Sequence, residues 1–133
     1  MTLISKRFTL LMSILSATIS CSFGFDVGKQ MTSSDRVIVS HQGTLEDVRE
    51  VTISDVSRLE ILKKAITDTK KPFFKCGYDG RLQFFKGDRL LLDAEFNLME
   101  ECRHVVFECG SRICSSGLSP NSVTLLKNLM IGF

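Results

Sequence analysis

The densest strand and turn signals in the chain lie in residues 73–118, FFKCGYDGRLQFFKGDRLLLDAEFNLMEECRHVVFECGSRICSSGL. Short apolar runs alternate there with glycine-containing turns at residues 77–80 and 87–88, an arrangement typical of antiparallel hairpins. The segment therefore predicts a β-meander, that is, a small antiparallel sheet of sequence-adjacent strands. We expect its strands at residues 73–76, 82–85, 90–96, 102–109 and 113–118.

Two further strands and a helix are expected before this segment. Val37–Val39 and Val48–Ile53 are rich in β-branched residues and lie on either side of a turn at Gly43, so we expect them to pair. Residues 54–71 are expected to form a helix, because Ser54 is a good N-cap and apolar positions recur at helical spacing after it. These apolar positions are Val56, Leu59, Leu62, Ala65 and Ile66.

A second helix is expected after the meander. Ser119 can cap it, and Pro120 suits the first helical position, where the amide hydrogen that proline lacks has no helical partner. Its apolar side consists of Val123, Leu126, Leu129 and Met130. The order of the elements predicts an α+β fold, in which two α-helices pack on one face of the small antiparallel sheet and two disulfides stabilise it.

The first 24 residues have the order of a secretory signal peptide. Lys6 and Arg7 precede the apolar stretch Phe8–Ile19, and small residues follow it. A helix of that stretch spans about 18 Å, against about 30 Å for the hydrocarbon of a membrane, so we expect cleavage and no transmembrane helix afterwards. The predicted domains are a signal peptide (1–24), a flexible N-terminal arm (25–36) and a single α+β domain (37–133).

Two cleavage positions compete. Ser22 and Gly24 are small residues suited to cleavage before Phe25, which would release a soluble periplasmic or secreted protein. Cleavage before Cys21 would instead expose a cysteine for lipidation, as in bacterial lipoproteins, and would anchor the chain to a membrane. The first outcome is favoured, because Thr18 lies where an aliphatic residue usually precedes a lipidated cysteine.

Four cysteines follow the signal: Cys76, Cys102, Cys109 and Cys114. An even number in a small exported chain predicts two disulfides and an oxidising compartment. Of the three possible connectivities we favour Cys76–Cys102 with Cys109–Cys114, because a turn at residues 111–112 would place the last two directly opposite each other in a hairpin. The gaps of 25, 6 and 4 residues between the cysteines suit neither a zinc site nor a Cys-x-x-Cys redox centre, so no metal or cofactor is expected.

The charge balance argues against a nucleic-acid partner. The chain has 17 Lys and Arg residues and 15 Asp and Glu residues. Removal of the signal takes away Lys6 and Arg7 but no acidic residue, which leaves 15 of each sign. Because nucleic-acid binding needs a surplus of positive charge, we expect the partner to be a protein or a component of the cell envelope.

No catalytic motif is present in the sequence. A hydrolase would need an unrecognised set, such as His104 with Asp79 or Glu108, to converge in one pocket. We expect His104 to be an outward-facing strand residue instead. Tyr78, Asp79 and Arg81 surround a tight turn and are the best candidates for a binding surface, since recognition residues often lie on such tips.

These features predict a small exported, disulfide-stabilised binding protein without enzymatic activity, of the kind that acts as an inhibitor or an immunity-like partner. Two alternatives remain from other functional classes. One is a lipid-anchored structural protein of the envelope, held through Cys21. The other is a hydrolase of cell-wall or peptide substrates that uses an unrecognised set of side chains.

Overall fold

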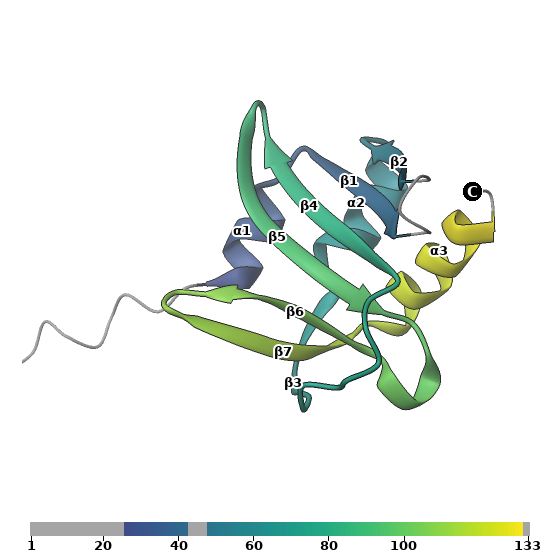
Figure 1. The fold of residues 1–133 in the computed structure, drawn as a ribbon. Coiled ribbons are helices and arrows are strands. Elements are labelled where there is room, and N and C mark those ends of the chain that lie inside the picture. Colours follow the sequence, from purple (N-terminus) through teal and green to yellow (C-terminus); the bar gives the residue numbers. More distant parts are fainter. Residues whose placement is uncertain (1–25, 43–47, 132–133) are drawn as a thin grey trace, which may run out of the picture.

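The computed structural model describes residues 26–42 and 48–131, which form a seven-stranded antiparallel sheet with three α-helices (Figure 1). The sheet has the order β2-β1-β4-β5-β6-β7-β3, so β4 to β7 are the predicted meander and the α+β class is confirmed. The strands are β1 (Arg36–Gln42), β2 (Val48–Ile53), β3 (Ile66–Lys70), β4 (Gly80–Lys86), β5 (Arg89–Asn97), β6 (His104–Cys109) and β7 (Arg112–Leu118). The helices are α1 (Val27–Ser33), α2 (Val56–Lys63) and α3 (Pro120–Ile131), and a short 3-10 helix, η1 (Glu100–Cys102), precedes β6.

One face of the sheet carries the hydrophobic core. Alternate residues of each strand point to this face, so Val39, Leu82 and Ala94 lie in one row across β1, β4 and β5. The neighbouring rows are also apolar and buried, and the helices cover them with apolar side chains. The buried side chains from the helices are Met31, Leu59, Leu62, Val123 and Leu126. We call the opposite side of the sheet the outer face.

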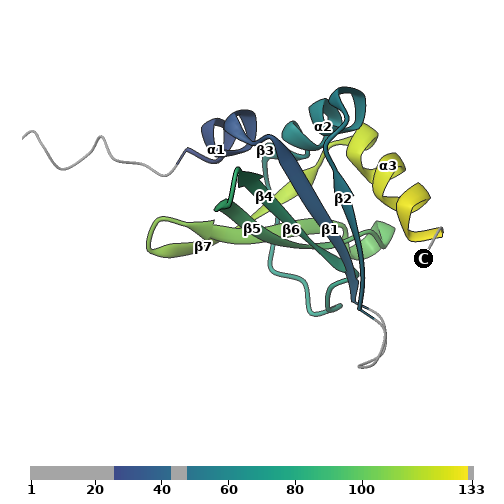
Figure 2. The same cartoon turned by 90° about the horizontal axis from the view of Figure 1, so that it is seen from above.

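The helices pack on one another as well as on the sheet. Helix α1 contacts β4 and β5, whereas α2 contacts β1 and both other helices. Figure 2 shows α3 extending past the edge strand β2, and its main contact is with α2. The helices therefore differ from the prediction in two ways. The described residues form three α-helices and not two, and the three do not lie clearly on one face of the sheet.

Helix α1 lies in the segment expected to be a flexible arm. Asp26 caps it by accepting a hydrogen bond from the backbone N–H of Lys29 at 3.1 Å. Met31 is buried and attaches the helix to the core. A single buried residue in an otherwise polar stretch gives too weak a periodic signal to predict a helix.

Helix α2 is shorter than predicted. Its N-cap is Asp55 rather than Ser54, and the Asp55 carboxylate accepts a hydrogen bond from the N–H of Arg58 at 3.1 Å. The helix ends at Lys63, and the residues after it form β3, in which Ile66 lies opposite Leu118 of β7. Ile66 would be buried either in a longer helix or in a strand. The spacing of apolar residues alone therefore does not show whether the helix continues or a strand begins.

The first predicted strand of the meander, residues 73–76, is instead part of a loop. The whole loop, residues 71–79, connects β3 to β4, and we call it the covering loop. The N–H of Lys71 donates a hydrogen bond to the carbonyl of Ser115 at 3.0 Å, and the Ser115 hydroxyl donates one to the Pro72 carbonyl at 3.1 Å. The loop is thus attached to β7 without becoming a strand of the sheet.

Both disulfides have the predicted connectivity. Cys76 is bonded to Cys102, with a Cα–Cα distance of 6.2 Å, and this bond ties the covering loop to η1, just before β6. Cys109 is bonded to Cys114, with a Cα–Cα distance of 5.9 Å, and this bond joins β6 to β7 near their turn.

The turn between β6 and β7 is shifted by one residue from the prediction. Cys109 lies opposite Arg112, so the turn consists of Gly110 and Ser111, and Gly110 takes the positive φ of 69° that such a turn requires. Cys114 is therefore a diagonal neighbour of Cys109 rather than the residue directly opposite. The two side chains still lie on the same face of the hairpin, which is why the bond can form.

We predict that the two disulfides contribute unequally to stability. The loop-entropy relation gives about 3.5 kcal/mol for Cys76–Cys102, which closes the longer loop, and about 2 kcal/mol for Cys109–Cys114. The free energy of unfolding of each double Cys→Ser variant, measured by urea denaturation, checks this order. A larger loss in the variant without Cys109–Cys114 would contradict it.

We also predict an acid-dependent contribution from the N-cap of α2. The hydrogen bond from the Arg58 guanidinium, at 2.8 Å, lowers the pKa of Asp55 from its ordinary 3.8 to about 2. Because the folded pKa lies below the unfolded one, the stabilisation is present above pH 3.8 and is lost as the pH falls towards 2.

The variant Asp55→Asn isolates this effect, because asparagine can cap a helix but does not titrate. The difference in unfolding free energy between the wild type and this variant should shrink between pH 6 and pH 2. Urea denaturation at several pH values measures it. A difference that does not change with pH would show that the ion pair with Arg58 adds no stability.

Candidate functional site

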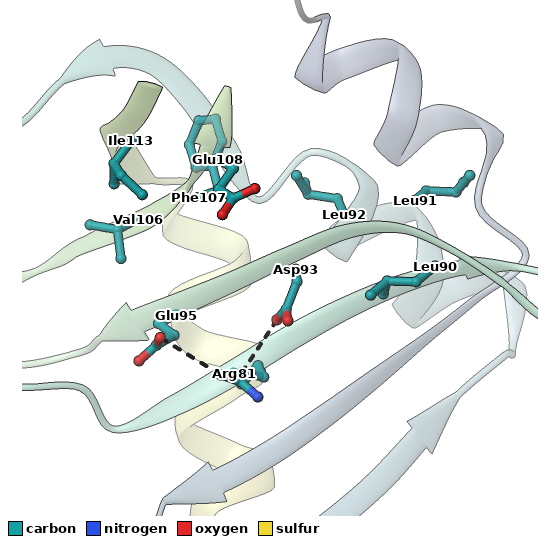
Figure 3. Close-up of a pocket in the computed structure, with 10 residues that line it drawn as sticks. All are labelled: Arg81, Leu90, Leu91, Leu92, Asp93, Glu95, Val106, Phe107, Glu108 and Ile113. Atoms are coloured by element: carbon teal, nitrogen blue, oxygen red, sulfur yellow. Dashed lines mark ion pairs between the residues drawn. The ribbon is translucent and has the colours of Figure 1, made fainter. Parts of the chain in front are cut away.

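A groove opens in the outer face where two hairpins of the meander separate. Strands β5 and β6 are paired from Asn97 and His104 to Ala94 and Phe107, and the register goes no further. Beyond this point the β4–β5 and β6–β7 hairpins diverge (Figure 1). The space between them is a groove of about 530 Å³, with a lining from β4, β5, β6 and β7 (Figure 3).

The walls of the groove carry exposed apolar side chains. Leu90 of β5 is 44% exposed and Ile113 of β7 is 57% exposed, and they come from opposite sides of the opening. Leu92 and Phe107 are buried deeper, where the groove meets the core, and Val106 extends the apolar surface on the outer face. A partner that covered Leu90 and Ile113 would remove apolar surface from water, which favours binding.

Charged side chains lie beside this apolar surface. The Arg81 guanidinium forms ion pairs with Asp93, at 3.3 Å from Nε to Oδ1, and with Glu95, at 3.7 Å from Nη2 to Oε1 (Figure 3). The buried Nε makes no hydrogen bond, so the contact with Asp93 is a pairing of charges without hydrogen-bond geometry. Glu108 lines the other side of the groove and adds a third carboxylate.

The pairing of β4 with its neighbours positions Arg81. Arg81 lies directly opposite Glu95 of β5, and Asp93 is its diagonal neighbour on the same face. Gly80, just before it, has no room for a side chain, because an added Cβ would lie 2.7 Å from the Phe96 ring and closer still to the Ser40 carbonyl. Glycine at this position lets β4 approach β1 and Phe96, while Arg81 points to the outer face.

The structure separates the three residues predicted as a binding tip. The Tyr78 ring packs 5.8 Å from the His104 ring, and the Asp79 carboxylate accepts a hydrogen bond from the N–H of Leu98 at 2.6 Å. Both side chains therefore hold the covering loop against the sheet. Of the three, Arg81 lines the groove.

His104 lies on the outer face, like Val106 of the same strand, but it is not solvent-exposed as expected for an outward-facing residue, since it is 0% exposed. The covering loop lies over it, and Phe74 packs edge-on against its ring at 5.0 Å. Nδ1 lies 2.6 Å from the carbonyl of Cys102 and is therefore the protonated donor nitrogen, which leaves the buried Nε2 without a hydrogen bond.

Of the set named for the hydrolase alternative, Glu108 lines the groove, whereas His104 and Asp79 do not. His104 contacts Cys102 and two aromatic rings, and Asp79 is held by Leu98. Glu108 lies on the same strand as His104 but four residues further along, which corresponds to about 13 Å. Glu108 lines the groove and His104 does not, so these two side chains have no common site.

Two groove residues, Asp93 and Glu95, were not among the candidates from the sequence, and Glu108 was named there only for the hydrolase set. A signal was present in β5, because its acidic residues alternate with Ala94 and Phe96, and such alternation places the acids on the outer face. The divergence of β5 from β6 has no comparable local signal. Cys21, the proposed lipidation site, lies outside the described residues.

Two other kinds of feature, metal-ligand clusters and membrane-spanning helices, concern the described ranges, 26–42 and 48–131. Within them, no three His, Cys, Asp or Glu side chains are grouped so that they could hold a metal ion. None of the helices found there has both the length and the apolar character needed to cross a membrane. The groove, with its exposed apolar walls and its carboxylates, is the feature of this part of the chain that we take as the candidate binding site.

Comparisons with known proteins do not assign a family to this fold or to its groove. No family model matches the chain, and neither curated proteins nor solved structures give a significant match.

Proposed function

We propose that the chain is a small exported, disulfide-stabilised binding protein without enzymatic activity, whose partner occupies the groove between the diverging hairpins. The partner is a protein or a component of the cell envelope. The observation that carries this proposal is the exposure of Leu90 and Ile113 beside Arg81 and its carboxylates. Apolar surface edged by charged groups is characteristic of interaction sites.

The position of the disulfides supports a role in recognition. Cys109–Cys114 spans the hairpin that forms one wall of the groove, directly beside the opposed pair Glu108 and Ile113. A wall held in this way loses less conformational freedom when a partner binds, and such preorganisation favours affinity. The bond thus stabilises the end of the β6–β7 hairpin, beyond Phe107, where β6 no longer pairs with β5.

Export is supported by the sequence and by the cysteine pairing. The N-terminal residues have the order of a signal peptide, and disulfides persist in oxidising compartments such as the periplasm or the extracellular space. We therefore propose that binding takes place in the periplasm or outside the cell.

We predict that a photo-crosslinking residue in place of Ile113 will capture a partner in the cells that naturally produce the protein. The matched control is the same residue in place of Ile131, which is 83% exposed on α3 and does not line the groove. Because Ile113 would touch the partner, its adduct should be several times more abundant than that from position 131. Denaturing gel electrophoresis followed by mass spectrometry measures both adducts.

A second variant tests whether the adduct depends on the groove. Leu90→Ser on the opposite wall should weaken the adduct from position 113, because it removes apolar surface that the partner covers. Intact-mass measurement confirms that both disulfides remain formed in each variant. No adduct at position 113, or equal adducts at positions 113 and 131, would contradict binding in the groove.

A further inference from the structure

We propose that the groove binds an extended, positively charged segment of a partner polypeptide. This inference rests on the binding function proposed above and specifies the chemistry of the partner. Three independent features of the groove carry it: an unpaired strand edge, apolar side chains on both walls, and an excess of negative charge.

The unpaired strand edge favours an extended occupant. Strand β5 begins at Arg89, but its pairing with β6 begins only at Ala94. Between these points the described chain pairs β5 with β4 on one side and with no strand on the side facing the groove. A free edge of this kind offers backbone N–H and C=O groups to an extended peptide, which can add to the sheet as a strand.

The apolar side chains favour an occupant whose own side chains alternate. Leu90 and Ile113 face the opening from its two walls, and Val106 lies beside Ile113 on the outer face (Figure 3). Successive side chains of an extended segment point in opposite directions, so every second one can reach this apolar surface. Leu92 and Phe107 are buried where the groove meets the core, so side chains on one side of such a segment can pack there while the intervening ones lie beside the carboxylates of the outer face.

The charges favour a cationic occupant. Asp93, Glu95 and Glu108 carry three negative charges at neutral pH, and the Arg81 guanidinium in the same groove carries one positive charge. Arg81 is already paired with Asp93 and Glu95. Glu108 is exposed and forms no ion pair with any of the described residues.

A lysine or arginine of the partner would therefore find a carboxylate without displacing Arg81. An acidic segment would instead face three carboxylates, and the single guanidinium among them is already neutralised. Like charges placed together oppose binding, so the groove discriminates by sign as well as by shape.

The test uses two labelled nine-residue peptides with blocked termini and the oxidised, exported form of the protein. One peptide alternates lysine with valine, and the other alternates glutamate with valine. Fluorescence anisotropy should show saturable binding of the lysine peptide and much weaker binding of the glutamate peptide. Because exposed charges are screened by salt, affinity for the lysine peptide should fall as ionic strength rises from about 0.05 M to about 0.5 M.

Matched variants locate the binding. Glu108→Gln should weaken binding of the lysine peptide by about twofold to fivefold, which is the range expected for loss of one exposed ion pair. Glu101→Gln removes the same charge from η1, outside the groove, and should leave the affinity unchanged. Ile113→Ser should also weaken binding, whereas Ile131→Ser on α3 should not.

Other outcomes would overturn the inference. Equal binding of the two peptides, or equal effects of Glu108→Gln and Glu101→Gln, would show that the groove does not select positive charge. If the lysine peptide fails to bind while the crosslink from position 113 still forms, the cationic segment is wrong and the binding function stands. If the crosslink also fails, both proposals are wrong.

Discussion

The short pairing of β5 with β6 is the constraint on which the rest of the structure depends. It runs only from Ala94 opposite Phe107 to Asn97 opposite His104, yet it joins the two hairpins of the meander into one sheet. At one end of this pairing the hairpins diverge and the groove begins. At the other end the strands lie under the covering loop. One end of the β5–β6 pairing is therefore open to solvent, and the other is covered.

The covered end shows how a small protein accommodates buried polar groups. The Asn97 side chain donates a hydrogen bond to the Gly77 carbonyl at 2.9 Å and accepts one from the N–H of Met99 at the same distance. Asp79 accepts a hydrogen bond from Leu98, and the Cys76–Cys102 disulfide closes the loop. These contacts take the place of a strand at the start of the meander, and they enclose a histidine that the sequence suggested would be exposed.

Local signals predicted much of this fold, because they depend on neighbouring residues. The turn at residues 87–88, four of the five meander strands, and the cap of α3 at Ser119 follow from short sequence patterns. The cap is confirmed, because the Ser119 hydroxyl accepts a hydrogen bond from the backbone N–H of Ser122 and donates one to the Ser122 hydroxyl. The disulfide connectivity followed from hairpin geometry even though the turn was misplaced by one residue.

The features that were missed depend on contacts between distant segments. Strand β3 forms because it pairs with β7 some fifty residues later, and α1 is held by one buried methionine. The groove was missed for the same reason, since Leu90 and Ile113 look like ordinary strand residues until the hairpins are seen to separate. Of the predicted binding residues, Arg81 lines the groove because its cross-strand register places it there.

The Cys109–Cys114 bond has a consequence for the maturation of the protein. The wall residues Glu108 and Ile113 each lie one position before a bonded cysteine, at the end of a hairpin that β5 does not support. Before oxidation this end of the hairpin samples more conformations, and a partner would have to order it upon binding. Under the proposed function, a chain whose Cys109 and Cys114 are still reduced would therefore have a poorly ordered groove wall, and formation of the bond would complete it.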